Sequence, residues 1–268
     1  MKAPVGRSLH IGVNHLDKNH YGQEASLAGC EFDAQAMEAI ATARGFKTQM
    51  LLTEKATAGR VTSAIADAAA ALRPADIFLV TYAGHGAQVP DLNGDEEDEK
   101  DETWVLFDRM LVDDELSALW GRFAQAVRIV VVSDSCHSGS VTREALFGPP
   151  LEGVFRNLPR DVEEATYDRN KTLYDEIQAA NPQGDHVGIG ATILLLSGCL
   201  DNQLSRDGER NGAYTERLLQ VWSDGAFKGG YSVFQDAIRE LLPSDQSPNF
   251  LPTGFPNPLF EAQVPFTI

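Results

Sequence analysis

The chain has few cysteines, and their number and spacing exclude several kinds of protein. Among its 268 residues only Cys30, Cys136 and Cys199 carry a thiol. An odd and sparse set of this kind excludes a disulfide framework and favours a reducing compartment. No pair has the C-x-x-C spacing of a structural zinc site, and we expect no organic cofactor. Each thiol is therefore a candidate either for packing or for chemistry.

Basic residues are also scarce. The sequence has 22 lysines and arginines against 39 acidic residues, which gives a formal net charge of −17 at pH 7. Nucleic acids and anionic membranes both require a basic footprint on their protein partner. The charge therefore argues against these two partners and suits a cationic substrate or a bound cation.

Long apolar runs are missing as well. The amino-terminal residues lack the apolar stretch of a signal peptide, and no segment has the uninterrupted apolar length needed to span a bilayer. Apolar residues make up 43% of the chain, a normal share for a globular protein. We therefore expect a soluble, cytoplasmic protein that is long enough to bury a full core.

The segments that are present alternate between strand and helix patterns. Strand patterns cover residues 8–14, 47–52, 76–82, 103–107, 128–133 and 191–199, and helical patterns cover 30–44, 57–72, 113–123, 212–222 and 232–242. Alternation of this kind predicts an α/β fold with a mostly parallel central sheet flanked by helices. Residues 141–190 show little periodicity and are expected to be a linker without regular structure.

Two short segments place chemistry-bearing side chains just beyond apolar strands. His85 follows the strand pattern at 76–82, and Cys136 follows the one at 128–133. Since the carboxyl ends of parallel strands meet at one edge of a sheet, ligands and catalytic groups gather there. A thiol becomes a nucleophile when a base raises its thiolate fraction. Cys136 and His85 are therefore candidates for a nucleophile–base dyad, and their separation along the chain is similar to that of caspases.

Taken together, the motifs of the chain resemble those of metacaspases and of their bacterial counterparts, the orthocaspases. The segments that carry the resemblance are Tyr82-Ala83-Gly84-His85-Gly86, Asp134-Ser135-Cys136-His137-Ser138-Gly139, Leu27-Ala28-Gly29-Cys30-Glu31-Phe32-Asp33-Ala34, Gly94-Asp95-Glu96-Glu97-Asp98, Leu196-Ser197-Gly198-Cys199-Leu200-Asp201-Asn202-Gln203 and Gly212-Ala213-Tyr214-Thr215. The resemblance implies a single caspase-like domain over residues 1–268. Its parts would be a large-subunit-like portion (1–140), the linker (141–190) and a small-subunit-like portion (191–268).

The resemblance also implies roles for individual residues. It makes the chain a cysteine endopeptidase that cleaves after arginine or lysine through an acyl-enzyme, with Cys136 as nucleophile and His85 as general acid and base. The backbone N–H groups of Cys136 and Gly86 would form the oxyanion hole. The substrate's basic side chain would be bound by Asp33 and Asp134, with Cys30 and Ala83 lining the same pocket. Independently, Asp134 lies two residues before Cys136, so on a strand both side chains point to one face.

An acidic run suggests a cation site. Eight of the twelve residues from Asp91 to Glu102 are acidic, a pattern that is usually a solvated face. The glycine of this run lies too early in the loop for an EF-hand. Resemblance to metacaspases implies Ca²⁺ ligands at Asp101, Asp113 and Asp114, although a further expected acid falls on Arg143.

The predicted linker contains several basic residues at which such an enzyme could cut itself, namely Arg143, Arg156, Arg160, Arg169 and Lys171. We therefore expect self-processing within residues 141–190, protein or peptide substrates with arginine or lysine at the cleavage position, and a monomer. Three alternatives stay open: an aspartate-specific caspase, a catalytically silent interaction module and a calcium-binding signalling protein. The carboxylates of the motif segments disfavour the first, and intact Cys136 and His85 disfavour the second.

Overall fold

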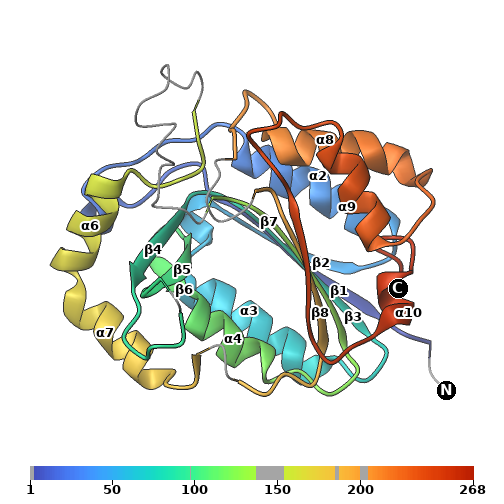
Figure 1. Ribbon diagram of the computed structural model, residues 1–268, viewed down its shortest axis with the longest axis horizontal. Coiled ribbons are helices and arrows are strands. Elements are labelled where there is room, and N and C mark those ends of the chain that lie inside the picture. Colours follow the sequence, from blue (N-terminus) through green and yellow to red (C-terminus); the bar gives the residue numbers. More distant parts are fainter. Residues whose placement is uncertain (1–2, 97, 137–153, 185–186, 200–204) are drawn as a thin grey trace.

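The computed structural model describes residues 3–96, 98–136, 154–184, 187–199 and 205–268 (Figure 1). Within these residues, six strands form a central sheet in the order β2-β1-β3-β7-β8-β9. The first five strands in this order are parallel to their neighbours, and β9 pairs antiparallel with β8 at the edge. The bounds are β1 Gly6–Gly12, β2 Lys47–Leu52, β3 Ile77–Ala83, β7 Arg128–Asp134, β8 Thr192–Ser197 and β9 Asn249–Gly254. The predicted mostly parallel sheet is confirmed.

Helices cover both faces of this sheet (Figure 1). Every residue of β3 and β7 is buried, as expected for central parallel strands that are covered on both sides. One apolar cluster packs the sheet against the helices α2 (Cys30–Ala43), α8 (Ala213–Trp222) and α9 (Tyr231–Arg239). The other packs it against α3 (Ala58–Ala71) and α4 (Asp113–Trp120). The two carboxyl ends of β3 and β7 are thereby held in a fixed frame.

A small antiparallel sheet continues directly from the histidine segment. It contains β4 (Gly86–Pro90), β5 (Lys100–Val105) and β6 (Met110–Val112), where the sequence predicted a single strand. Tyr82 fixes this sheet to the end of β3, because its hydroxyl donates to the carbonyl oxygens of His85 at 2.6 Å and Val105 at 3.0 Å. Its ring stacks on Trp104 with a centroid separation of 4.8 Å. These contacts position the backbone that carries His85.

The expectation that residues 141–190 lack regular structure is wrong for much of the described part. Helices α6 (Arg160–Arg169) and α7 (Lys171–Ala180) occupy it. Their buried faces include Thr166, Tyr167, Tyr174 and Gln178, so polar and amphipathic side chains form much of the contact. Apolar periodicity in the sequence does not reveal a helix face that is buried through polar side chains. Residues 137–153, with His137 and Arg143, lie outside the described residues.

The remaining described elements are short. They are the helices α1 (Lys18–Tyr21) and α10 (Pro258–Glu261) and the single turns η1 (Thr53–Lys55) and η3 (Ser223–Gly225). Across the part of the chain that the structure describes, every helix is too short or too polar to cross a membrane.

Candidate active site

His85 and Cys136 lie at the ends of two adjacent strands. Parallel pairing of β3 and β7 places Ala83 opposite Asp134. His85 lies two residues after Ala83, and Cys136 lies two residues after Asp134, so the two side chains start from equivalent positions on adjacent strands. Both are buried, with relative exposures of 4% and 0%. The structure therefore brings these two predicted residues to one end of the sheet.

The imidazole of His85 is held in one tautomer by the backbone. Its Nε2 lies 2.8 Å from the carbonyl oxygen of Ala25, which can only accept, so Nε2 carries the proton. Nδ1 is buried and, within the described residues, has no hydrogen-bond partner. Burial lowers the pKa of His85 to about 4, against the opposing effect of the Ala25 carbonyl and a weaker one from the backbone of Asn157. His85 is thus a neutral imidazole in which Nδ1 carries the lone pair that can accept a proton.

The thiol of Cys136 contacts the backbone of Ser205. The Ser205 N–H donates to Sγ at 2.5 Å, and Sγ lies 3.6 Å from the Ser205 carbonyl oxygen. Across the described residues no hydrogen bond joins Sγ to His85, so the predicted dyad is brought close in the fold but is not directly paired.

A segment from the predicted linker crosses these strand ends. The carbonyl oxygen of Arg156 accepts hydrogen bonds from the N–H groups of Gly86 at 2.9 Å and Cys136 at 3.1 Å. The Arg156 N–H donates to the carbonyl oxygen of Ser205 at 2.9 Å. Two residues further along the chain, the Leu158 N–H donates to the carbonyl oxygen of Gly86, also at 2.9 Å. One backbone carbonyl therefore lies between the two N–H groups that the sequence predicted as an oxyanion hole.

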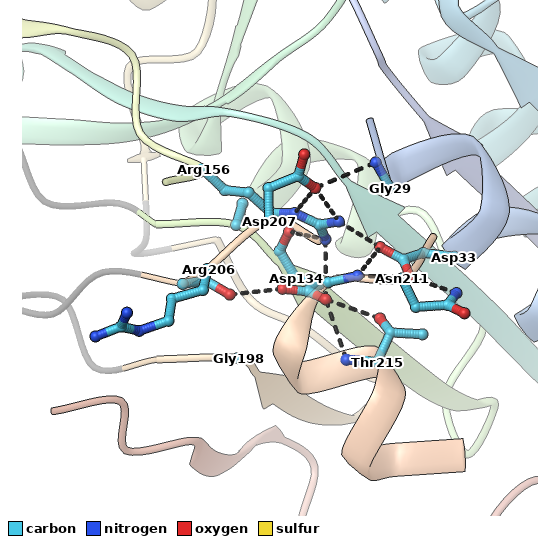
Figure 2. Close-up of polar contacts among 12 residues, drawn as sticks. Gly29, Asp33, Asp134, Arg156, Gly198, Arg206, Asp207, Asn211 and Thr215 are labelled. Atoms are coloured by element: carbon cyan, nitrogen blue, oxygen red, sulfur yellow. Dashed lines mark hydrogen bonds and ion pairs between the residues drawn. The ribbon is translucent and has the colours of Figure 1, made fainter. Parts of the chain in front are cut away.

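The side chain of Arg156 is fully buried and is surrounded by three carboxylates, which we call the arginine site: Asp33, Asp134 and Asp207 (Figure 2). Nη2 lies 2.5 Å from Asp33 Oδ2, and Nη1 lies 2.9 Å from Asp134 Oδ2. Asp207 Oδ1 accepts from Nη2 at 2.9 Å and from Nε at 3.2 Å. Nη1 also donates to the backbone carbonyl of Asp134 at 3.2 Å. The guanidinium is thus bound on all of its N–H edges.

Other groups hold each carboxylate in place. These are Asn211 and Gly212 for Asp33, Ser205 and Thr215 for Asp134, and the N–H groups of Ala28 and Gly29 for Asp207. Burial raises the pKa of Asp33 to about 7, although Arg156 opposes the shift. Three acids buried together need a cation, and in this structure the chain supplies it.

The structure also places the two other predicted pocket residues. Cys30, the first residue of α2, is completely buried and packs with Leu27 and Ala83. Burial raises the pKa of the Cys30 thiol well above its usual range, so it stays protonated and acts in packing. Cys30 lies one helical turn before Asp33 on α2, next to a carboxylate of the arginine site.

Sequence reasoning missed Asp207 and the position of Arg156. Asp207 lies in an irregular stretch with no strand or helix pattern, and only the fold brings it beside Asp33. Arg156 was one of five basic residues in the linker with nothing to distinguish it. No local signal in the sequence could have selected either residue.

The predicted cation ligands also come together. Carboxylate oxygens of Asp101, Asp113 and Asp114 all lie within 4.8 Å of one another, and a second such group joins Asp101 to Asp91 and Asp95. Asp101 is only 1% exposed, and its Oδ2 has no hydrogen-bond partner within the described residues. Burial, followed by the charge of Asp114, raises the pKa of Asp101 to about 8. Oxygen-only ligands of this kind fit a hard divalent cation.

Comparison with known proteins identifies the class. Residues 6–259 match the family described as Caspase domain (C14 peptidases), and the chain belongs to that family. The caspase-like α/β fold is thereby confirmed, and family membership supports a cysteine peptidase that acts on proteins.

Within that class the resemblance to metacaspases is confirmed. Metacaspase-1A from Aspergillus fumigatus is 33% identical over 283 residues, which cover 90% of this chain and 66% of that protein. Metacaspase-1 from Mycosarcoma maydis is 26% identical over 279 residues, which cover 90% of this chain and 68% of that protein. The chain therefore spans about two thirds of the length of these relatives.

Two solved structures are similar to the chain. The crystal structure of protein GSU0716 from Geobacter sulfurreducens shares 49% identity with a TM-score of 0.92, covering 98% of this chain and 99% of that one. Caspase-1 from Spodoptera frugiperda shares 11% identity with a TM-score of 0.56, covering 94% and 86%. The second likeness is one of fold alone.

Proposed function

We propose that the chain is a cysteine endopeptidase that cleaves after arginine or lysine, and that it cuts its own bond between Arg156 and Asn157. One observation carries the proposal. The Arg156 side chain fills the arginine site while its carbonyl oxygen accepts from the N–H groups of Gly86 and Cys136. A substrate residue before a scissile bond would need both contacts at once.

The proposed reaction follows from these contacts. Sγ of Cys136 attacks the carbonyl carbon of Arg156, and a thioester forms as the bond to the Asn157 nitrogen breaks. The thiol proton passes to Nδ1 of His85 and from there to the leaving amine of Asn157. Water then hydrolyses the thioester, releasing the Arg156 carboxylate and restoring the thiol.

The N–H groups of Gly86 and Cys136 would stabilise the negative charge that develops on the Arg156 oxygen. Removal of one such donor typically costs about 3 kcal/mol of transition-state stabilisation. Both donors belong to backbone segments fixed by β3, β4 and β7, so little reorganisation is needed during the reaction.

The arginine site disfavours the alternative of an aspartate-specific caspase. An aspartate side chain in the place of Arg156 would add a fourth negative charge among three buried carboxylates, and unpaired buried charges are strongly destabilising. A silent interaction module would have no need to hold a peptide carbonyl between two N–H groups beside a cysteine.

Self-cleavage can be tested with three variants of the purified chain. We expect mass spectrometry of the wild type to show a fragment that ends at Arg156, and both Cys136→Ala and Arg156→Gln to remain uncut at that bond. Arg160→Gln is the matched control, because Arg160 is an exposed linker arginine in α6, and it should be cut like the wild type.

The outcomes separate the two parts of the proposal. A wild type that hydrolyses arginine peptides but remains intact would defeat self-cleavage and leave the peptidase. Cleavage of arginine peptides by Cys136→Ala would overturn the mechanism itself.

We also propose that Asp101, Asp113 and Asp114 bind Ca²⁺. The support is the buried Oδ2 of Asp101, which lacks a partner within the described residues, at the centre of the carboxylate cluster. Ca²⁺ accepts six to eight oxygens in flexible geometry, so Asp91 and Asp95 could complete the ligand set. The ion would neutralise the charges that raise the pKa of Asp101.

A further inference from the structure

The three carboxylates of the arginine site do not contact the same part of the guanidinium. Asp33 and Asp134 contact only the terminal nitrogens, Nη2 and Nη1. Asp207 contacts the inner edge, where its Oδ1 accepts from both Nε and Nη2 of Arg156 (Figure 2). Among the described residues, Asp207 is therefore the acceptor for the Nε–H group.

We propose that Asp207 is the residue that makes this site select arginine over lysine. The proposal rests on the peptidase function above and deepens it, since that function alone does not distinguish the two basic side chains.

The chemistry of the two side chains explains the selection. A lysine in the same extended conformation has a methylene group where arginine has Nε, and its ammonium group lies where arginine has Cζ. The methylene cannot donate to Asp207. The ammonium falls one bond short of the positions from which Nη1 and Nη2 reach Asp134 and Asp33. Lysine can recover those two contacts by a small shift or through a water molecule, but it has no group with which to replace Nε–H.

Asp207 is also held too firmly to move toward a lysine. Its side chain is 3% exposed, and the Ala28 and Gly29 N–H groups at the start of α2 donate to its carboxylate at 2.7 and 3.2 Å. Its own N–H donates to the carbonyl of Val154 at 2.8 Å, on the segment that leads to Arg156. The acceptor is therefore preorganised beside the place that Nε occupies.

The substitution Asp207→Asn tests this geometry with little change in shape. An amide has a single acceptor oxygen, whereas the carboxylate of Asp207 accepts on Oδ2 from Ala28 and on Oδ1 from Gly29 and Arg156. In either orientation of the amide, an NH₂ group faces an N–H donor. Depending on the orientation of the amide, the contact with Ala28 or the contacts with Gly29 and Arg156 are lost. The negative charge is lost in both orientations.

The first experiment compares kcat/KM for two peptides that differ only in arginine or lysine before the scissile bond. We expect the wild type to prefer arginine by about 100-fold, since two charge-assisted hydrogen bonds are at stake. Asp207→Asn should lower that ratio by about tenfold or more, mainly by slowing the arginine peptide. Asp33→Asn should slow both peptides and change the ratio by less than about threefold, because Asp33 meets only a terminal nitrogen.

Asp236→Asn is the matched control, because Asp236 is an exposed aspartate paired with an arginine on α9. It should leave both rates unchanged. An Asp207→Asn ratio equal to that of the wild type would overturn the inference while leaving the peptidase function in place.

The second experiment measures binding without cleavage. In the double variant Cys136→Ala, Arg156→Gln the chain no longer places a guanidinium in its own site, and calorimetry can compare product-like peptides that end in arginine or lysine. The inference is supported if the double variant binds the arginine peptide more tightly than the lysine peptide and the triple variant with Asp207→Asn binds both equally. This comparison does not depend on cleavage. Equal affinity for both peptides before that third change would defeat it.

Discussion

His85 is the residue whose protonation state decides whether the proposed reaction can begin. Burial lowers its pKa to about 4 in this structure, whereas an exposed histidine titrates near 6.5. The ring therefore keeps its Nδ1 lone pair through the mildly acidic range in which an exposed histidine would become charged.

We expect the rate of self-cleavage to remain nearly constant between pH 7 and 5 and to fall only as the pH approaches 4. The reason is that protonation of Nδ1, which removes the base, occurs only near the lowered pKa. The uncut protein can be prepared with Cys136 as a mixed disulfide, released by a phosphine, and sampled over time at each pH. Circular dichroism at each pH controls for unfolding, and a midpoint near 6.5 would contradict the prediction.

Single residues differ in how far the sequence could predict them. Cys136 and His85 could be found because each follows an apolar run that was recognisable as a strand, and adjacent parallel strands share an edge. Asp134 could be found for the same reason, since it ends β7. Asp207 could not, because its place depends on an irregular stretch folding back over the start of α2.

At the scale of elements, the segment around Arg156 behaves as a short strand with an anchor on each side. Val154 and Arg156 pair with residues 205–207, and Leu158 pairs with Gly86. The side chain of Leu158 is 1% exposed and belongs to the larger apolar cluster. The bond after Arg156 thus lies between a charged anchor and an apolar one.

We expect Leu158→Ala to lower the free energy of unfolding by about 2–4 kcal/mol, the usual cost of truncating a buried leucine. The same change should slow self-cleavage, because the carbonyl of Arg156 is then less firmly held between Gly86 and Cys136. Denaturant unfolding of variants that also carry Cys136→Ala measures the first effect, and a time course of cutting measures the second.

The matched control is Leu173→Ala, at a position on α7 that is 39% exposed. It should leave both quantities close to those of the parent protein. Equal self-cleavage rates for Leu158→Ala and the wild type would show that the apolar anchor does not position the bond.

The elements that sequence reasoning missed share a physical cause. Strands β4 and β6 are short, and tertiary contacts such as the stacking of Tyr82 on Trp104 hold the small sheet in place. Helices α6 and α7 bury polar and amphipathic groups such as Thr166 and Tyr174. By contrast, the long buried strands and the helices that cover them carry strong apolar patterns of their own, and for those the predicted alternation holds.

At the scale of the whole molecule, the carboxylate cluster joins the small sheet to α4. Asp101 belongs to β5, and Asp113 and Asp114 begin α4. The charge of Asp114 opposes ionisation of Asp101, and a bound cation would offset that repulsion. Because β4 in the same small sheet begins at Gly86, a cation here would act on the backbone next to His85.

We expect the protein to bind Ca²⁺ with a dissociation constant on the order of 10⁻³ M and to cleave arginine peptides faster when the ion is bound. Asp101→Asn should remove the binding, and Asp98→Asn, an exposed change in the same acidic loop, should keep it. Calorimetric titration of the Cys136→Ala protein measures affinity. Equal cleavage rates in EGTA, Ca²⁺ and Mg²⁺ would retire the calcium proposal.

Because Arg156 occupies the arginine site of its own chain, the proposed self-cleavage has a defined dependence on protein concentration. Cys136 and the scissile carbonyl belong to one molecule, and the Cys136 N–H already donates to the Arg156 oxygen, so the proposed first cut needs no encounter between two molecules. Its half-time is then the same in a dilute and in a concentrated solution. The activation of a protease that must dimerise depends on its concentration. The proposed first cut in this chain is instead a first-order reaction within each molecule, and dilution would not slow it.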